Sequence, residues 1–288
     1  IAARFSNDHF FVFECSDQSS IPSKVDVVYN SMLKSKDINR RVRIKTGIYY
    51  CHENDPEIGI ACDHARLACN SVKNRHDVHC CVYDEMLRDK LRRQQFVVDH
   101  IEEAINKGYI NVYYQPVIRV KTGEICGYEA LVRWLDPSFG LISPAQFIDT
   151  LEQFHLIHLI DRYVIKRVCE DYKKLAESKE PLVPVSVNIS RLDFELCDIF
   201  GYVEETRSEY GVPRSMLDLE ITESALNDNV GYIKNECDKM KALGYHIWLD
   251  DFGSGYSSLN SMADYDFDVL KLDIVFLRSL DSSPKTRT

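Results

Sequence analysis

Residues 217–222 read Leu217-Asp218-Leu219-Glu220-Ile221-Thr222, a strict alternation of apolar and polar side chains. Because successive side chains of a β-strand point to opposite faces, this pattern predicts a strand with one apolar and one polar face. Residues 185–190 repeat it as Val185-Ser186-Val187-Asn188-Ile189-Ser190. Packing on helices explains the apolar face. The polar face needs another explanation, since parallel sheets are normally covered on both sides.

Short apolar runs alternate with longer amphipathic segments along the chain on both sides of these two stretches. We expect strands at 112–117, 125–134, 183–190, 217–222, 246–251 and 269–276. We expect helices at 143–154, 156–176, 202–210 and 230–243. Strands that alternate with helices predict parallel pairing, and therefore an α/β fold that is either a doubly wound sheet or a (β/α)₈ barrel.

The polar faces of the predicted strands carry a recurring set of side chains. In a barrel these faces point into the lumen, and residues near the carboxyl ends of the strands line the active site. Five strands would bring together Glu129, Asn188, Glu220, Asp250, Asp251 and Lys271. Any one of these carboxylates taken alone is better explained as a surface or hydrogen-bonded group. Their shared position favours a common site.

The chemistry of that site follows from its charge. Carboxylates in a closed space repel one another and are costly to desolvate, and divalent cations would relieve both effects. All the donors are oxygen atoms, which favours Mg²⁺ or Mn²⁺ over Zn²⁺. The residues alone predict metal-assisted chemistry on an anionic substrate, with phosphoester hydrolysis and enolate chemistry both open.

The composition limits the class of partner. A chain of 288 residues has room for two domains, and its net charge of −10 argues against a nucleic-acid polymer, whose phosphates need basic patches. The chain has no apolar run long enough to predict a membrane-spanning helix. Its ten cysteines form no pairing framework and are expected to be buried reduced thiols of a cytoplasmic protein. A longer parent protein could still be tethered to a membrane.

We divide the chain into three parts. Residues 1–83 have a mixed α/β pattern, with strands expected at 10–14 and 41–50 and a helix at 63–73. Apolar residues then recur at helical spacing, which predicts one long linking helix over 84–107. The second domain is expected over 108–288. The run from His76 to Cys81 lacks a second pair of zinc ligands at usable spacing, so we predict no zinc site there.

The motifs of the second domain, from residue 111 onward, resemble the EAL family of phosphodiesterases. Glu129-Ala130-Leu131 is similar to the triplet that names the family, and Val132-Arg133-Trp134 continues it. The family order and spacing are also kept by Tyr114-Gln115-Pro116, Val187-Asn188-Ile189-Ser190, Glu220-Ile221-Thr222-Glu223-Ser224, Asp250-Asp251-Phe252-Gly253-Ser254-Gly255 and Lys271-Leu272-Asp273. The resemblance implies a (β/α)₈-type, TIM-like barrel that hydrolyses cyclic di-GMP to the linear dinucleotide pGpG.

The resemblance also implies a role for each matched residue. Two Mg²⁺ or Mn²⁺ ions would be held by Glu129, Asn188, Glu220, Asp250 and Asp251. Lys271 would hold the attacking water or a phosphate oxygen, and Glu223 would pin the loop after Asp251. Gln115 and Arg133 would bind the substrate. The alternative is a catalytically inactive cyclic di-GMP receptor or scaffold, although the ligands present here favour an enzyme.

Residues 1–83 resemble the second half of a GGDEF domain, the diguanylate cyclase fold that often precedes EAL domains. The signature loop departs from the family, since it reads Ser6-Asn7-Asp8-His9-Phe10, without the glycines and with His9 in place of the glutamate. Without glycine the backbone approaches nucleotide phosphates less readily. We therefore expect no synthesis of cyclic di-GMP from GTP, and a regulatory or homodimer-forming role instead.

The number of strands is too small for a complete barrel. Lys271 lies on the sixth predicted strand, and the polar residues 281–288 close the sequence. Two more β/α units would need roughly 25–30 residues each. We therefore expect a fragment of a longer chain, in which the barrel has a gap between its sixth and first strands.

Overall fold

The computed structural model describes residues 1–6, 8–34, 43–52, 55, 57–75, 77–178, 181–226, 230–253, 265–274, 276 and 278. The chain divides into two compact units, Ile1–Arg93 and Gln94–Thr288. The division falls within helix α3 (Glu85–Asn106), the long helix that the sequence predicts. Predictions on Asn7, His76, Ser254, Gly255 and the closing residues 279–288 lie outside the described residues.

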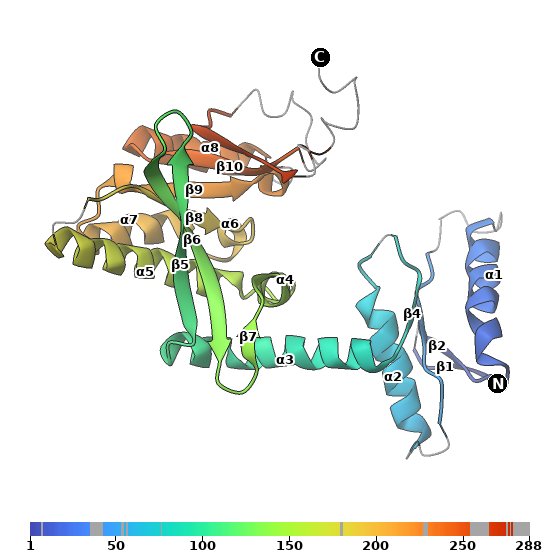
Figure 1. Cartoon of the computed structure of the whole chain (residues 1–288). Coiled ribbons are helices and arrows are strands. Elements are labelled where there is room, and N and C mark those ends of the chain that lie inside the picture. The colour runs from blue at the N-terminus through green and yellow to red at the C-terminus, as the bar shows by residue number, and fades with distance from the viewer. Residues whose placement is uncertain are drawn as a thin grey trace. The chain divides into compact units, whose positions relative to one another are not determined.

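The first unit holds two small sheets and two longer helices in its described part (Figure 1). One sheet pairs β1 (Ala2–Arg4) and β2 (Phe10–Val12) antiparallel, and the other pairs β3 (Thr46–Ile48) and β4 (Cys80–Val82) parallel. The helices are α1 (Ile21–Lys34) and α2 (Ile58–Ser71), with a short 3₁₀ turn at Gln18–Ser20. β2 and β3 are shorter than the predicted strands, and residues 41 and 42 are not described.

The second unit is built on one curled sheet (Figure 1). Its strand order is β11-β10-β9-β8-β6-β5, with β7 paired to β6. The strands are β5 (Ile110–Arg119), β6 (Glu124–Asp136), β7 (Gly140–Ile142), β8 (Val185–Ile189), β9 (Leu217–Thr222), β10 (Ile247–Phe252) and β11 (Val269–Leu272). All six predicted strands of this domain are therefore present, although β11 ends at Leu272, before the predicted end at residue 276.

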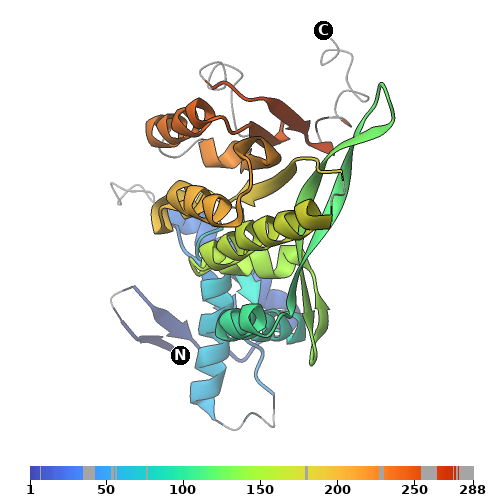
Figure 2. The ribbon, with the colours of Figure 1, turned by 90° about the vertical axis from the view of Figure 1, so that its left-hand side faces the viewer.

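Helices cover the strands where the sequence predicts them. They are α4 (Pro144–Gln153), α5 (Ile157–Ser178), α6 (Asp193–Leu196), α7 (Ile199–Tyr210) and α8 (Val230–Leu243). Short 3₁₀ turns lie at Arg214–Met216 and Glu223–Leu226. Figure 2 shows α5, α7 and α8 on one side of the sheet. The expected apolar face of β9 packs there, with Leu217, Leu219 and Ile221 fully buried.

One expectation about the sheet is wrong, because β5 and β6 pair antiparallel rather than parallel. A turn of four residues, 120–123, joins these strands, and Gly123 has a φ of 74°. A parallel pair needs a crossover of a dozen or more residues. A connection of this length therefore allows only a hairpin. From β6 to β11 the pairing is parallel, as expected.

The sheet is open between its two end strands. β11 and β5 are the two end strands of the sheet, and they do not pair with each other in the described residues. The expected gap between the sixth and first barrel strands is thereby confirmed. The incomplete (β/α)₈-type architecture is the one that the sequence predicts.

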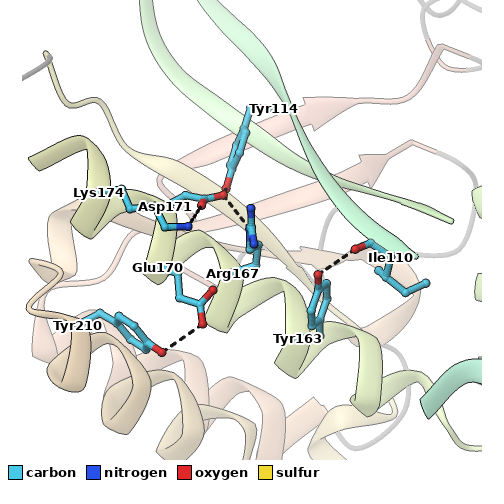
Figure 3. A network of polar contacts seen from close by, with 8 residues as sticks. All are labelled: Ile110, Tyr114, Tyr163, Arg167, Glu170, Asp171, Lys174 and Tyr210. Atoms are coloured by element: carbon cyan, nitrogen blue, oxygen red, sulfur yellow. Dashed lines mark hydrogen bonds and ion pairs between the residues drawn. The ribbon is translucent and has the colours of Figure 1, made fainter. Parts of the chain in front are cut away.

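Polar contacts fasten helix α5 to its neighbours on both sides (Figure 3). The Tyr114 hydroxyl of β5 donates to Asp171 Oδ2 at 2.9 Å, and the Tyr163 hydroxyl donates to the Ile110 carbonyl at 2.8 Å. Tyr210 of α7 donates to Glu170 Oε1 at 3.2 Å. Burial and the Asp171 carboxylate raise the pKa of the Tyr114 phenol, which keeps it a donor. The bonds of Tyr114 and Tyr163 hold β5 against α5, and Tyr114 directly precedes Gln115 in that strand.

All ten cysteines are free thiols. Only Cys169 and Cys237 are buried, whereas Cys15 and Cys51 are exposed, so the expectation of buried thiols holds for a minority. No helix among the described residues combines the length and apolar character needed to cross a membrane.

Candidate functional site

The register of the sheet places the predicted polar residues on adjoining strands. Glu129 of β6 lies beside Ser186 of β8, and Asn188, two residues along β8, lies beside Glu220 of β9. Thr222 of β9 in turn lies beside Asp250 of β10. Because side chains alternate along each strand, Glu129, Asn188, Glu220 and Asp250 share one face of the sheet.

Three of these side chains meet. Glu129, Glu220 and Asp250 each offer one carboxylate oxygen, and these atoms lie within 4.8 Å of one another. We call this group the carboxylate cluster. It is the one such group of potential metal-binding side chains in the described part of the chain. The Glu220 side chain is 0% exposed, while those of Glu129 and Asp250 are 19% and 21% exposed, so the cluster opens toward solvent on one side.

Lys271 of β11 reaches into the middle of the carboxylate cluster. Its Nζ lies 2.6 Å from Glu220 Oε2, 3.0 Å from Asp250 Oδ2 and 3.1 Å from Glu129 Oε2. Burial raises the pKa of Glu220, and the Lys271 ammonium opposes that shift. Burial would lower the pKa of Lys271, but the bonds and charges of Glu220 and Asp250 raise it above its ordinary value. The lysine is therefore fully charged at neutral pH.

The two consecutive aspartates of β10, Asp250 and Asp251, lie in a β-bulge. The register between β10 and β11 shifts between Leu249 and Phe252, and Asp251 has a φ of 57°. Positive φ is rare outside glycine and costs of order 1–3 kcal/mol, which proteins tend to accept at functional sites. The Asp251 amide donates to Asp250 Oδ1 at 2.8 Å. The Asp251 side chain is not a member of the carboxylate cluster.

The segment after the bulge is held by Glu223. The Gly253 amide donates to Glu223 Oε2 at 2.8 Å, and Glu223 is buried. Gly253 has a φ of 91°, and a Cβ there would lie 2.6 Å from the ring of Phe276, so only glycine suits the position. The role of Glu223 in holding the loop after Asp251 stays a prediction. The loop residues 254–264 lie outside the described residues.

The other predicted site residues line the same face without entering the cluster. Gln115 of β5 is exposed and lies beside Glu129 in the register. Arg133 is half-buried, and its Nη1 donates to the Val132 carbonyl at 2.8 Å. Asn188 is half-buried beside Glu220. Their assignment as substrate and metal ligands stays a prediction.

A second pair of acids lies beneath the end of β8, and sequence reasoning missed it. The Ser190 amide donates to Asp193 Oδ2 at 2.9 Å and to Asp161 Oδ2 at 3.3 Å. Burial, then the neighbouring Asp193, raises the pKa of Asp161 well above its ordinary value. A charged residue in a helix such as α5 is normally read as solvent-exposed, so the sequence held no signal for the pair.

The donor set of the carboxylate cluster fits a divalent cation. Its atoms are all carboxylate oxygens, the ligands that Mg²⁺ and Mn²⁺ prefer. Glu220 Oε1 is buried and makes no hydrogen bond, and a buried polar atom without a partner needs explaining. The fold, the ordered motifs and this geometry lead to a single family.

A family model described as "EAL domain" matches residues 98–288. The chain belongs to the EAL family. An uncharacterized protein, sll1895 of Synechocystis, is 31% identical over 238 residues, which are 82% of this chain and 34% of that protein. The cyclic di-GMP phosphodiesterase PdeR of Escherichia coli is 32% identical over 225 residues, 78% of this chain and 34% of that protein. The EAL chain therefore spans about a third of the length of these relatives.

Solved structures give the same assignment. The structure described as PaMucR phosphodiesterase in a c-di-GMP complex superposes with a TM-score of 0.60 and 28% sequence identity, covering 66% of this chain and 77% of that one. EAL structures of this kind are TIM-like barrels, which agrees with the curled, open sheet of this EAL domain.

Proposed function

We propose that this EAL domain is a phosphodiesterase that opens cyclic di-GMP to linear pGpG with Mg²⁺ or Mn²⁺. The observation that carries the proposal is the carboxylate cluster, in which Glu129, Glu220 and Asp250 converge from three strands around Lys271. Support comes from the relative PdeR, named a cyclic di-GMP phosphodiesterase, and from the PaMucR phosphodiesterase solved with c-di-GMP.

We propose the ligand set for the ions from the residues that surround the carboxylate cluster. Glu129, Glu220 and Asp250 would provide charged oxygens, with Glu220 Oε1 available as the buried ligand. Asn188, which lies beside Glu220, and Asp251, which follows Asp250, would complete two sites. Bound Mg²⁺ or Mn²⁺ would activate water and stabilise the negative charge that develops at phosphorus.

The chain's own residues would place the substrate. Gln115 is exposed beside Glu129, where its amide can hydrogen-bond an anionic nucleotide. Arg133, two residues further along β6, can bind phosphate by two parallel N–H bonds once it leaves the Val132 carbonyl. Glu223 would keep Gly253 and the bulge at Asp251 in place, so the acidic pair of β10 keeps its spacing.

Nucleotide chromatography tests this function directly. The purified full-length parent is incubated with cyclic di-GMP and Mn²⁺, and conversion to pGpG is expected. Glu220→Gln should lower conversion at least ~100-fold. Glu209→Gln, at an exposed glutamate of α7, serves as the matched control and should leave it unchanged. An unaltered substrate peak with the wild-type protein contradicts the hydrolase.

A receptor is the second candidate, and one observation favours it. Lys271 already neutralises part of the negative charge of the carboxylate cluster, which lessens its demand for a bound cation. In a receptor, cyclic di-GMP would bind over the same face without being cleaved. Calorimetry that detects cyclic di-GMP binding with no pGpG formed in Mn²⁺ would select this function.

We also propose that residues 1–83 are the second part of a degenerate GGDEF domain with no cyclase activity. In the loop, Ser6 Oγ lies 2.8 Å from His9 Nδ1, and the same nitrogen lies 3.0 Å from Asp8 Oδ1. His9 is thus engaged within its own loop. GTP offered to the parent protein with Glu220→Gln in place should yield no cyclic di-GMP, and detectable product would contradict the proposal.

A further inference from the structure

We propose that Lys271 is a built-in counter-ion of the carboxylate cluster, and that its ammonium group and the first divalent cation compete for the same three carboxylates. The inference rests on the proposed metal-dependent function and adds to it a residue that sets metal affinity. In this role Lys271 is a positioning residue, whatever it later does to the substrate.

The geometry of the ammonium group supports this role. A lysine ammonium has three N–H donors and no acceptor. Nζ of Lys271 has three carboxylate oxygens within hydrogen-bonding range, from Glu220 at 2.6 Å, Asp250 at 3.0 Å and Glu129 at 3.1 Å. Every donor is thereby used, and every carboxylate of the cluster is contacted. The ammonium group thus occupies the position between three oxygen ligands that a metal ion would take.

Burial makes these contacts strong. The side chain of Glu220 is fully buried and that of Lys271 is 26% exposed. Removing one partner of a buried ion pair leaves an uncompensated charge, which is far costlier than losing a surface pair. Without Lys271 the three carboxylates would have to separate or take up protons, because like charges at this spacing repel.

The strand pairing fixes where Lys271 points. Leu270 pairs with Leu249 and Leu272 pairs with Phe252, so the β10 bulge lies directly opposite Lys271. The extra residue in β10 sets Asp250 against the ammonium group. The contact therefore follows from the backbone of both strands rather than from a freely chosen rotamer.

Competition with a divalent cation follows. Lys271 contacts Oε2 of Glu220 and leaves Oε1 buried without a hydrogen bond, so one oxygen is open to a first ion. Three carboxylates and one ammonium leave two negative charges, which still attract a dication. A second positive charge in the same small space repels the ammonium, which must withdraw from part of the cluster. Metal binding and Lys271 contact are therefore negatively coupled.

Metal titration of two variants tests the coupling. Lys271→Met keeps the length of the side chain and removes its charge, and Lys271→Arg is the matched control that keeps the charge. Binding of Mn²⁺ alone is followed by the electron paramagnetic resonance signal of the free ion, and stability by thermal unfolding with and without EDTA.

We expect Lys271→Met to unfold at a lower temperature than wild type in EDTA and to bind Mn²⁺ about tenfold more tightly, a typical coupling between two sites. Lys271→Arg should stay near the wild-type affinity. Equal or weaker Mn²⁺ binding by folded Lys271→Met would overturn the competition. Absence of Mn²⁺ binding to wild type and both variants would overturn the metal dependence of the proposed function as well.

A measurement on the wild-type protein covers the case in which Lys271→Met does not fold. Amine-specific acylation at Lys271, read by peptide mass spectrometry, should increase when Mg²⁺ is added, because the ion releases the ammonium group. Lys107, whose ammonium contacts Glu103 on the surface, is the internal reference and should be labelled equally with and without Mg²⁺. Unchanged or reduced labelling of Lys271 would overturn the proposal.

Discussion

Strand β9 carries two buried carboxylates on one face, Asp218 and Glu220, and they have different surroundings. Glu220 contacts the buried ammonium of Lys271 and lies among two further acids. Asp218, two residues earlier, contacts the ring of His246 at 3.1 Å, and that ring is half-exposed. Burial raises the pKa of both groups, for Asp218 to about 6.

The difference follows from position along the strand. Glu220 lies toward the carboxyl end of β9, where parallel strands of a barrel gather their functional residues. Asp218 lies toward the amino end, the face of such barrels that serves stability rather than catalysis. In the proposed function, an acid on this face would therefore serve chemistry at one end of the strand and folding at the other.

The largest expected effect is on turnover. Glu220→Gln should lower the rate of cyclic di-GMP cleavage by the parent protein at least ~100-fold, because it removes a charged member of the carboxylate cluster. Asp218→Asn should change the rate by less than a few-fold. Steady-state kinetics in Mn²⁺ measure both. Equal losses would show that the two ends of β9 are not functionally distinct.

A smaller effect on turnover is expected at Glu223, which lies outside the carboxylate cluster. Glu223→Gln keeps the size of the side chain but weakens its bond from the Gly253 amide, so the segment after Asp251 loses its anchor. Turnover should fall about 10-fold, the lower end for groups that orient metal ligands. Mn²⁺ affinity should be largely kept, in contrast to Glu220→Gln. A matching loss of Mn²⁺ by both variants would contradict the separate role of Glu223.

Much of this site could be predicted from the sequence, because strand alternation is a local property. The alternation in residues 217–222 places Glu220 on the polar face, and the order of the motifs supplies Glu129, Asp250 and Lys271. The triple contact of Lys271 could not be predicted, since it depends on the bulge opposite that residue. The same bulge keeps Asp251 out of the cluster, although it follows Asp250 directly in the chain.

Two further features depend on contacts distant in sequence. The antiparallel β5–β6 pair follows from the four-residue turn between them, a signal that the overall alternation of strands and helices outweighed. The acid pair of Asp161 and Asp193 joins α5 to α6 across 32 residues, and neither residue looks buried in its own segment. Local patterns predict the elements, whereas these contacts need the assembled fold.

The last prediction concerns the pH dependence of stability at the amino end of β9. In the folded protein Asp218 has a pKa of about 6, above its ordinary value of 3.8, because burial disfavours the charged form. The folded state therefore binds more protons than the unfolded state between these values, so this contribution to stability is present at low pH and is lost as pH rises toward 6. Asp218→Asn does not titrate, and it should gain stability relative to wild type by about 2 kcal/mol between pH 4 and pH 7.

Urea unfolding of both proteins across that pH range measures the gain. His246 supplies the matched control, since its interaction lowers the pKa of Asp218 and partly offsets the effect of burial. In a His246→Gln background the pKa of Asp218 should rise further, and the window in which wild type loses stability relative to Asp218→Asn should move to higher pH. A stability difference that does not vary with pH would mean that Asp218 is solvated in solution, and the contrast between the two ends of β9 would then reduce to the partners of Glu220 alone.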